Sequence, residues 1–147
     1  MKEIVGLVEK VKIIGRKGSV ETLAKFDTGA TDNSLDYKIA AMAGAGHVIS
    51  SVRVKSASAS NGYVRRPVIE ASIEIGGKRY HTKANLEDRD GLRYKVLIGR
   101  VLLKKFLIDV EKNNVSDEES SLKKRFLKEA GLKIGDVKFT PSGGKNG

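Results

Sequence analysis

The sequence predicts a single, mainly β fold: a small, closed or partly closed antiparallel β-structure. Three observations indicate this class. Short segments rich in β-branched residues alternate between apolar and polar positions, and glycine-containing turns separate them about every ten residues. The chain has 147 residues, which is enough for one sizeable core.

The first predicted strands form a hairpin. Residues 3–14 (EIVGLVEKVKII) alternate roughly, residues 15–18 (GRKG) are a turn, and residues 19–26 (SVETLAKF) return as the second strand. Residues 27–34 (DTGATDNS) then break the pattern with small and polar side chains. The strand therefore ends on a carboxylate, Asp27, next to residues that let the chain turn.

The middle of the chain predicts a three-stranded meander. Its segments alternate between apolar and polar residues, and two pairs of turn residues separate them. Small side chains surround the first turn, which is typical of a flexible lid. The segments and turns are, in chain order, residues 48–60, Asn61-Gly62, residues 66–75, Gly76-Gly77 and residues 78–86.

The last apolar region predicts three short elements after a polar loop at residues 87–91. Residues 93–99 have the pattern of a buried strand. Residues 100–107 predict one or two helical turns, and residues 106–112 predict a last short strand.

The final third changes character, so we expect a main domain over residues 1–112 and a C-terminal extension over 113–147. Ser116 and Glu119 form a capping box, which predicts a helix over residues 117–130. The tail TPSGGKNG, from Thr140 onward, predicts an unstructured end.

The composition is that of an ordinary globular chain with a strong basic excess. Lys and Arg number 28 against 18 Asp and Glu, a net charge of +10, which favours anionic partners. The basic residues are spread along the chain, which is equally typical of a solvated, lysine-rich surface.

Several functional classes are excluded or disfavoured. The chain has no Cys, which excludes disulfides and thiol nucleophiles. No apolar run approaches the ~20 residues of a membrane span. The N-terminal segment carries acids and lysines within its apolar pattern, unlike a secretory signal. We therefore expect a cytoplasmic protein with no membrane contact. Nucleic acid is disfavoured, because the basic residues are not interleaved with aromatic ones.

Asp27 is the residue with the clearest chemical potential. Thr28 can hydrogen-bond across to a neighbouring chain, Gly29 permits close approach of a backbone, and Ala30 leaves the carboxylate uncrowded. Two carboxylates about 3 Å apart would share one proton and activate a water. The chain has one such loop, so a second copy would supply the second carboxylate. The alternative interpretation is an ordinary Asp-initiated turn.

Three segments together resemble the retropepsin-type aspartic peptidases. They are FDTGA at 26–30, SNGYVRRPVI at 60–69 and LEDRDGLRYKVLIGRVLLKKFLIDV at 86–110. The order matches from about residue 2 to residue 112. The sequence is most similar to a bacterial and archaeal group associated with RimK and LysX and known as "ATP-dependent zinc protease". The resemblance implies a retropepsin-like closed β-barrel, the acid protease half-fold, with a short helix after the late glycine.

The resemblance also implies an aspartic endopeptidase that works as a homodimer on a peptide or protein substrate. Thr28 would interlock the two chains beneath the dyad, Gly29 would contact substrate backbone, and Arg100 would support the interface. The implied residues are Asp27 as the catalytic aspartate; Thr28, Gly29, Ala30, Gly99 and Arg100 as its support; Ser58, Ser60, Asn61, Gly62, Tyr63, Arg65 and Arg66 as a flap over the substrate; and Thr31 and Asp32 as a substrate grip.

The chain departs from the retroviral pattern after this motif. Retroviral relatives place an acid directly after DTGA and pair it with the arginine that follows the late glycine. Here that position is Thr31 and the acid comes next, at Asp32. We therefore expect Arg100 to pair with Asp32 or Asp36.

The sequence supports neither ATP nor zinc, so we expect no cofactor and no metal. It has no G-x-x-x-x-G-K-[ST] phosphate loop, and its two histidines, His47 and His81, lack the spacing of H-E-x-x-H. His81 is expected to face solvent from its strand.

Two functions from different classes remain at this point. The group's association with glutamate ligases implies an enzyme that trims acidic, glutamate-rich tails. The alternative is a weakly active or inactive module of the same fold that binds RNA or an acidic protein. Basic residues lining the cleft would favour the peptidase, and a basic face away from Asp27 would favour the binder.

Overall fold

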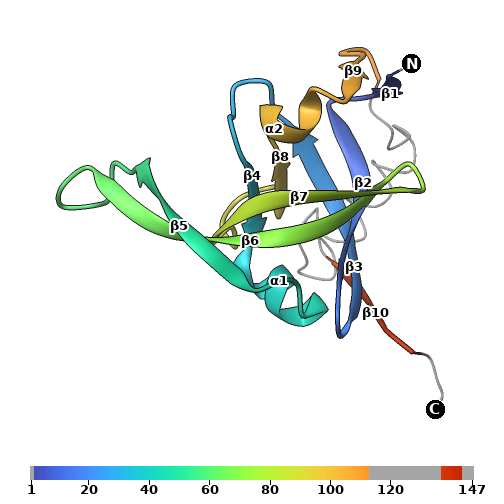
Figure 1. Cartoon of the computed structure of the whole chain (residues 1–147). Coiled ribbons are helices and arrows are strands. Elements are labelled where there is room, and N and C mark those ends of the chain that lie inside the picture. The colour runs from blue at the N-terminus through green and yellow to red at the C-terminus, as the bar shows by residue number, and fades with distance from the viewer. Residues whose placement is uncertain (1, 113–136, 144–147) are drawn as a thin grey trace, which may run out of the picture.

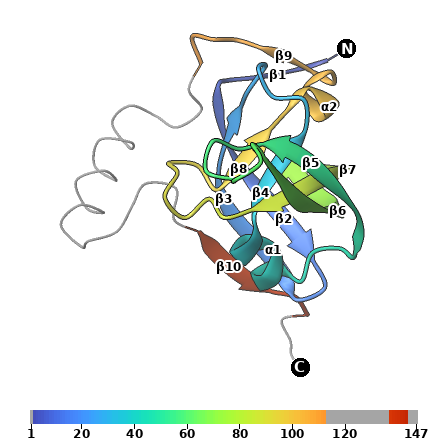
Figure 2. The same ribbon diagram turned by 90° about the vertical axis from the view of Figure 1, so that its left-hand side faces the viewer.

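A computed structural model describes residues 2–112 and 137–143. Strands curl into a closed barrel of six strands, with a two-stranded sheet at one end and a long hairpin projecting from the side (Figures 1 and 2). The prediction of a mainly β, closed barrel is confirmed. In chain order the elements are β1 (Glu3–Val5), β2 (Val8–Gly15), β3 (Gly18–Phe26), β4 (Asn33–Asp36), α1 (Tyr37–Ala43), β5 (Val48–Lys55), β6 (Tyr63–Ile75), β7 (Lys78–Glu87), β8 (Val96–Ile98), α2 (Arg100–Leu103), β9 (Phe106–Ile108) and β10 (Lys138–Pro141).

The sheet runs in the order β10-β3-β2-β6-β7-β4-β8, and β8 pairs back onto β3 to close the barrel. The expectation of antiparallel pairing holds for most of the strand pairs but is wrong for β3–β8, β4–β7 and β1–β9, which are parallel. Alternation along a strand identifies its two faces and leaves the direction of its partner open. Hairpin neighbours can be read from turns, whereas these parallel partners lie far apart in sequence.

Two of the three predicted turns have the expected form. The β2–β3 turn lies between Gly15 and Gly18, and the β6–β7 turn uses Gly76 and Gly77 at φ +61° and +81°. Positive φ at both central residues suits the twist of a two-residue hairpin.

The third turn is wider than the Asn61-Gly62 pair predicts. Lys55 pairs with Tyr63, so residues 56–62 form the tip. Ser56 N–H donates to the Gly62 carbonyl at 2.9 Å, and Tyr63 N–H donates to Asn61 Oδ1 at 3.1 Å. The serine and alanine side chains before Asn61 have little strand preference, so the ladder ends before them.

Strand β4 and helix α1 were not expected from the sequence. All four residues of β4 are buried, although Asn33, Ser34 and Asp36 are polar. Their polarity conceals the strand, because a buried strand normally carries an apolar run. Helix α1 ends at Gly44, whose φ of 66° is the left-handed C-cap conformation.

The C-terminal part also differs from expectation. Thr140 and Pro141 belong to β10, which pairs with Ser19 and Gly18 of β3, so the tail is not unstructured from Thr140 onward. Pro141 is tolerated because it ends an edge strand. The predicted helix over residues 117–130 lies outside the described residues. No helix in the described ranges is long and apolar enough to cross a membrane.

Candidate active site

Backbone hydrogen bonds on both sides hold the end of strand β3, and they set the position of Asp27. Phe26 is buried and its ring packs edge-on against Phe106 at 6.1 Å. Its N–H donates to the Leu7 carbonyl at 2.9 Å, and Asp27 N–H donates to the Ile98 carbonyl at 2.9 Å. Asp27 is the first residue to leave this packed environment, and it is half-buried.

The loop after β3 is a turn built on the Asp27 side chain. Gly29 N–H donates to Asp27 Oδ1 at 2.8 Å, and Ala30 N–H donates to the Asp27 carbonyl at 3.2 Å. An Asp that accepts from the second residue after it is an ordinary turn former. An ordinary Asp turn and a catalytic carboxylate are therefore compatible interpretations, because the Gly29–Asp27 bond that forms the turn also holds the carboxylate in one orientation.

The segment from Gly99 lies directly against this loop. Gly99 N–H donates to Asn33 Oδ1 at 3.0 Å, Arg100 N–H to the Ala30 carbonyl at 2.8 Å, and Val101 N–H to the Thr31 carbonyl at 3.0 Å. A Cβ on Gly99 would lie 2.3 Å from the Asp32 carbonyl oxygen. Only glycine permits this approach.

Arg100 braces the loop, but with different partners from those expected. Its Nη1 donates to the Thr28 carbonyl at 2.7 Å and its Nη2 donates to Thr31 Oγ1 at 3.0 Å. The expectation of a pair with Asp32 or Asp36 is wrong. Thr31 fills the retroviral acid's position with a neutral acceptor, and Asp36 is only 3% exposed and accepts from Arg89 N–H at 2.7 Å.

Asp32 lines a hollow beside this loop. The hollow has a volume of about 280 Å³ and joins the loop to α2, the base of the β5–β6 hairpin and the end of β7. Lys83 lies in the same lining, so the hollow carries one acidic and one basic side chain. Its lining residues are Asp32, Ser50, Ser51, Val52, Val68, Lys83, Ala84, Asn85 and Val101.

The expected flap residues form the projecting β5–β6 hairpin. Ser58, Ser60, Asn61 and Gly62 lie in its tip, and Tyr63, Arg65 and Arg66 begin β6. Figure 2 shows this hairpin in front of the barrel.

The two adjacent arginines of the hairpin have different surroundings. Arg66 pairs with Glu87 at 3.3 Å and contacts Asn85 Oδ1 at 3.4 Å. Glu87 also pairs with Arg89 at 2.8 Å, so one carboxylate lies between two guanidinium groups. The sequence did not reveal this network, because EDRDG reads only as a polar loop. It attaches the base of the hairpin to the barrel.

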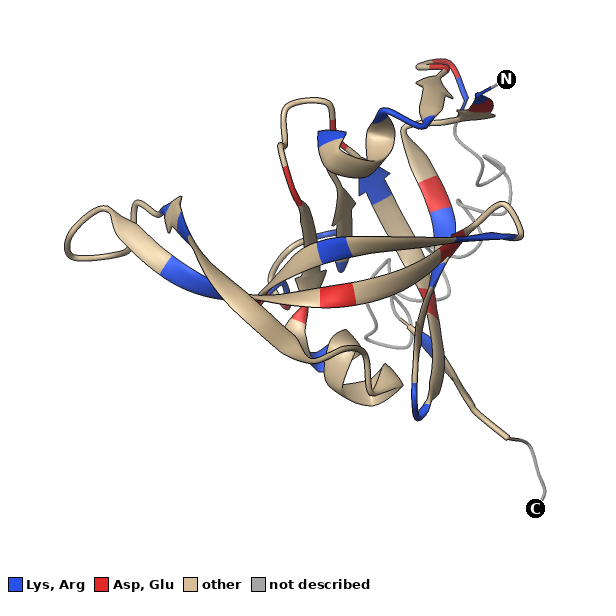
Figure 3. Cartoon of the chain, viewed as in Figure 1, with Lys and Arg blue, Asp and Glu red and all other residues tan. Residues whose placement is uncertain are grey.

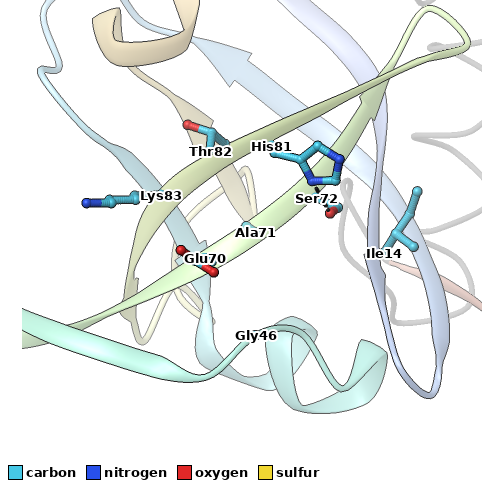
Figure 4. Close-up of a pocket in the computed structure, with 8 residues that line it drawn as sticks. All are labelled: Ile14, Gly46, Glu70, Ala71, Ser72, His81, Thr82 and Lys83. Carbon is cyan, nitrogen blue, oxygen red and sulfur yellow. Dashed lines mark hydrogen bonds between the residues drawn. The ribbon is translucent and has the colours of Figure 1, made fainter.

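A separate hollow on the barrel surface contains His81 (Figure 4). His81 is exposed and its Nδ1 lies 3.0 Å from Ser72 Oγ on the neighbouring strand. The lining of this hollow includes neither Asp27 nor Asp32. Within residues 2–112 and 137–143, no three His, Asp or Glu side chains gather as a metal site.

Comparison with solved structures finds many matching chains, among them the following two. The Legionella pneumophila protein Lpg0085, of unknown function (DUF785), aligns with a TM-score of 0.53 and 22% identity over 77% of this chain and 97% of that chain. The simian foamy virus (mac) protease aligns with a TM-score of 0.49 and 14% identity over 66% of this chain and 91% of that chain. No match was found among curated proteins.

The family comparison covers most of the chain. Residues 4–119 match the RimB-like family, described as "Retropepsin-like aspartic endopeptidase RimB". The match contains the Asp27 loop, the β5–β6 hairpin and the Gly99 segment. The chain therefore belongs to the RimB-like family of retropepsin-like aspartic endopeptidases.

Proposed function

We propose that the protein is an aspartic peptidase that acts as a homodimer, with one Asp27 from each chain. The observation that carries this proposal is the Asp27 loop itself. It presents one half-buried carboxylate, held in one orientation, at the end of a buried strand. Arg100 and the Gly99 segment form hydrogen bonds to the loop that carries this carboxylate. Family membership supports the same chemistry.

A group of exposed apolar side chains near Asp27 supports the dimer. Ile4 of β1 and Leu107 of β9 are direct register partners and are 57% and 54% exposed. Leu7 is also exposed. Its carbonyl accepts a hydrogen bond from the N–H of Phe26, the residue before Asp27. The β1–β9 sheet and α2 lie at the same end of the barrel as the β3–β4 loop (Figure 1). Burying these side chains against a second copy is favourable.

In the proposed mechanism the two Asp27 carboxylates share one proton. The ionised one takes a proton from a water, which attacks the amide carbonyl, and the protonated one donates to the developing oxyanion. When the tetrahedral intermediate collapses, the C–N bond breaks and the carboxyl that took the water proton gives it to the leaving amine nitrogen, while the other carboxylate recovers its proton from the hydroxyl of the intermediate. The loop bonds fix both carboxylates before substrate binds, which reduces the reorganisation needed during reaction. No covalent intermediate forms with the enzyme.

We propose that the substrates are polypeptides with acidic, glutamate-rich tails. The net charge of +10 and the presence of Lys83 in the hollow beside Asp32 support this choice. The β5–β6 hairpin would cover the bound segment. Thr31 is engaged by Arg100, so within the proposed substrate grip Asp32 is the residue that lines the open hollow.

The test is incubation with a protein that ends in an oligoglutamate tail, read by mass spectrometry. We expect wild type to shorten the tail and the Asp27→Asn variant to leave it intact. High salt should raise KM, because screening weakens the attraction of charged partners. Cleavage of an oligo(Gly-Ser) tail in preference to the glutamate tail would contradict the substrate class. Cleavage by the variant at the wild-type rate would contradict the mechanism.

Ala30 gives a prediction about pH. The retropepsin resemblance implies that a serine at this position can hydrogen-bond the catalytic carboxylate, and a donor of this kind favours the ionised form. Ala30 lacks that donor, so we expect hydrolysis to be fastest near neutral pH. Ala30→Ser should move the optimum of the pH–rate profile to lower pH. An optimum well below pH 4 in wild type, unmoved by the substitution, would contradict this.

A further inference from the structure

The β5–β6 hairpin has two faces of different character. Arg53 lies directly opposite Arg65, and Lys55 lies directly opposite Tyr63. Because side chains alternate along a strand, these four share one face, which we call the outer flap face. The opposite face carries Val52, Val54 and Val64 at the intervening positions.

The valine face is the one turned towards the active-site loop. Val52 and Val68 line the hollow that also contains Asp32. The lining of this hollow includes none of the four residues of the outer flap face, although it includes Ser51, which accepts a hydrogen bond from Arg65. Arg53, Lys55 and Arg65 are exposed on the outer flap face, whereas Arg66, on the valine face, is engaged by Glu87.

Among the residues that the structure describes, no acidic side chain pairs with the positive charges of the outer flap face. Residues 48–69 contain no Asp or Glu. Within the described ranges, no ion pair includes Arg53, Lys55 or Arg65. Figure 3 shows the basic residues of the hairpin with no acidic residue along its projecting part. Like charges directly opposite in an antiparallel pair are destabilising, so the Arg53–Arg65 pair disfavours the empty hairpin.

Both guanidinium groups are nevertheless held in place. Arg53 lies over the Tyr63 ring, 4.1 Å from its centroid, and Arg65 Nη1 donates to Ser51 Oγ at 2.9 Å. A guanidinium has five N–H donors, so each can still form a two-bond contact with a carboxylate. Groups that are already ordered lose less freedom when they bind a ligand.

We propose that the outer flap face binds an acidic polypeptide segment, outside the cleft that Asp27 serves. The proposal rests on the proposed function, because the segment would belong to the polypeptide whose bond reaches Asp27. Arg53 and Lys55 are two residues apart on β5, about 6.8 Å along the strand. Alternate carboxylates on an extended acidic segment have the same spacing. Bound carboxylates would also relieve the Arg53–Arg65 repulsion and stabilise the hairpin over the cleft.

A polypeptide fits this face better than a nucleic acid does. Binding of single strands relies on aromatic rings on which bases stack. Tyr63 is the one aromatic residue of the face. The Arg53 guanidinium already lies over its ring, where a base would have to stack. The planar forks of Arg53 and Arg65 match carboxylates in two-bond geometry.

The test measures binding of a fluorescein-labelled decaglutamate peptide to the full chain carrying Asp27→Asn, so that cleavage does not interfere. The double variant Arg53→Gln/Arg65→Gln should weaken binding by about 5- to 20-fold at low salt, as expected for two exposed ion pairs. Amide NMR shifts on adding the peptide should concentrate at residues 53–55 and 63–65. A Gly-Ser peptide of equal length should not bind.

The matched control is Lys10→Gln/Lys138→Gln, which removes the same charge from exposed positions on β2 and β10. It should change decaglutamate binding less than 2-fold, in line with the small effects of exposed charges. Equal weakening by both double variants would overturn the proposal in favour of attraction by net charge. Absence of decaglutamate binding, or shifts confined to the hollow around Asp32, would also overturn it. The proposal would likewise be overturned if a ten-nucleotide RNA bound more tightly than decaglutamate and this binding depended on Arg53 and Arg65. The binding result is independent of hydrolysis, so its failure leaves the assay of Asp27 unaffected.

Discussion

Replacing Asp27 by Asn should lower the rate of peptide hydrolysis by at least about 10³-fold, since an amide provides neither the base nor the acid of the dyad. The fold should survive, because Asn Oδ1 can still accept the Gly29 N–H bond that shapes the loop. Hydrolysis is measured as initial rates on an oligoglutamate-tailed protein. The unfolding midpoint in urea serves as the control for folding, and it should stay within about 0.5 kcal/mol of wild type.

The same substitution also tests whether the site needs two chains. Wild type and the Asp27→Asn variant are refolded together at varying ratios and constant total protein. If each active unit needs two wild-type chains, activity follows the square of the wild-type fraction, about a quarter at an equal mixture. A site complete within one chain would give a linear dependence and half the activity. The linear result would contradict the shared dyad, even if the variant alone is inactive.

Local sequence signals predicted the parts of this molecule that local chemistry determines. The glycine turns, the strand ending at Asp27 and the helical turn after Gly99 could be read from short segments, because each depends on neighbouring residues. The resemblance indicated that Gly99 and Asp27 belong together, and in the structure Asp27 N–H donates to the carbonyl of Ile98, the residue before Gly99.

The features that the sequence did not reveal depend on distant partners. Strand β4 carries polar residues in a buried position because each has a partner elsewhere: Asn33 binds Gly99, and Asp36 binds Arg89. The Arg66–Glu87–Arg89 network likewise joins a hairpin to a loop that reads as plain polar sequence. A polar residue in a strand reads as exposed until its partner is known. The partners of Arg100 were also not evident from the sequence. Its guanidinium bonds the Thr28 carbonyl and the Thr31 hydroxyl rather than the expected Asp32 or Asp36.

Gly99→Ala is expected to cost about 1–3 kcal/mol of unfolding free energy and most of the activity, as for overpacking of a tight site. The added Cβ would lie 2.3 Å from the carbonyl oxygen, 2.7 Å from the carbonyl carbon and 2.9 Å from the nitrogen of Asp32. These are backbone atoms, which cannot rotate away as a flexible side chain can. Relief requires the loop and α2 to separate, which strains the Arg100–Ala30 and Gly99–Asn33 bonds behind Asp27.

The Gly99→Ala substitution tests the effect of the clash between the added Cβ and the Asp32 backbone, and it does not test backbone strain. Gly99 has φ −100° and ψ −177°, which alanine adopts freely, so the conformation alone predicts no penalty. Gly91→Ala is the matched control, because a Cβ there meets nothing within 4 Å. It should change the unfolding free energy by less than about 0.5 kcal/mol and leave kcat unchanged. If urea titration and initial rates give Gly99→Ala the same values as this control, the close packing of the Gly99 segment does not hold the Asp27 loop. If Gly99→Ala stays folded but loses kcat, the contact positions Asp27 for the reaction as well as stabilising the barrel.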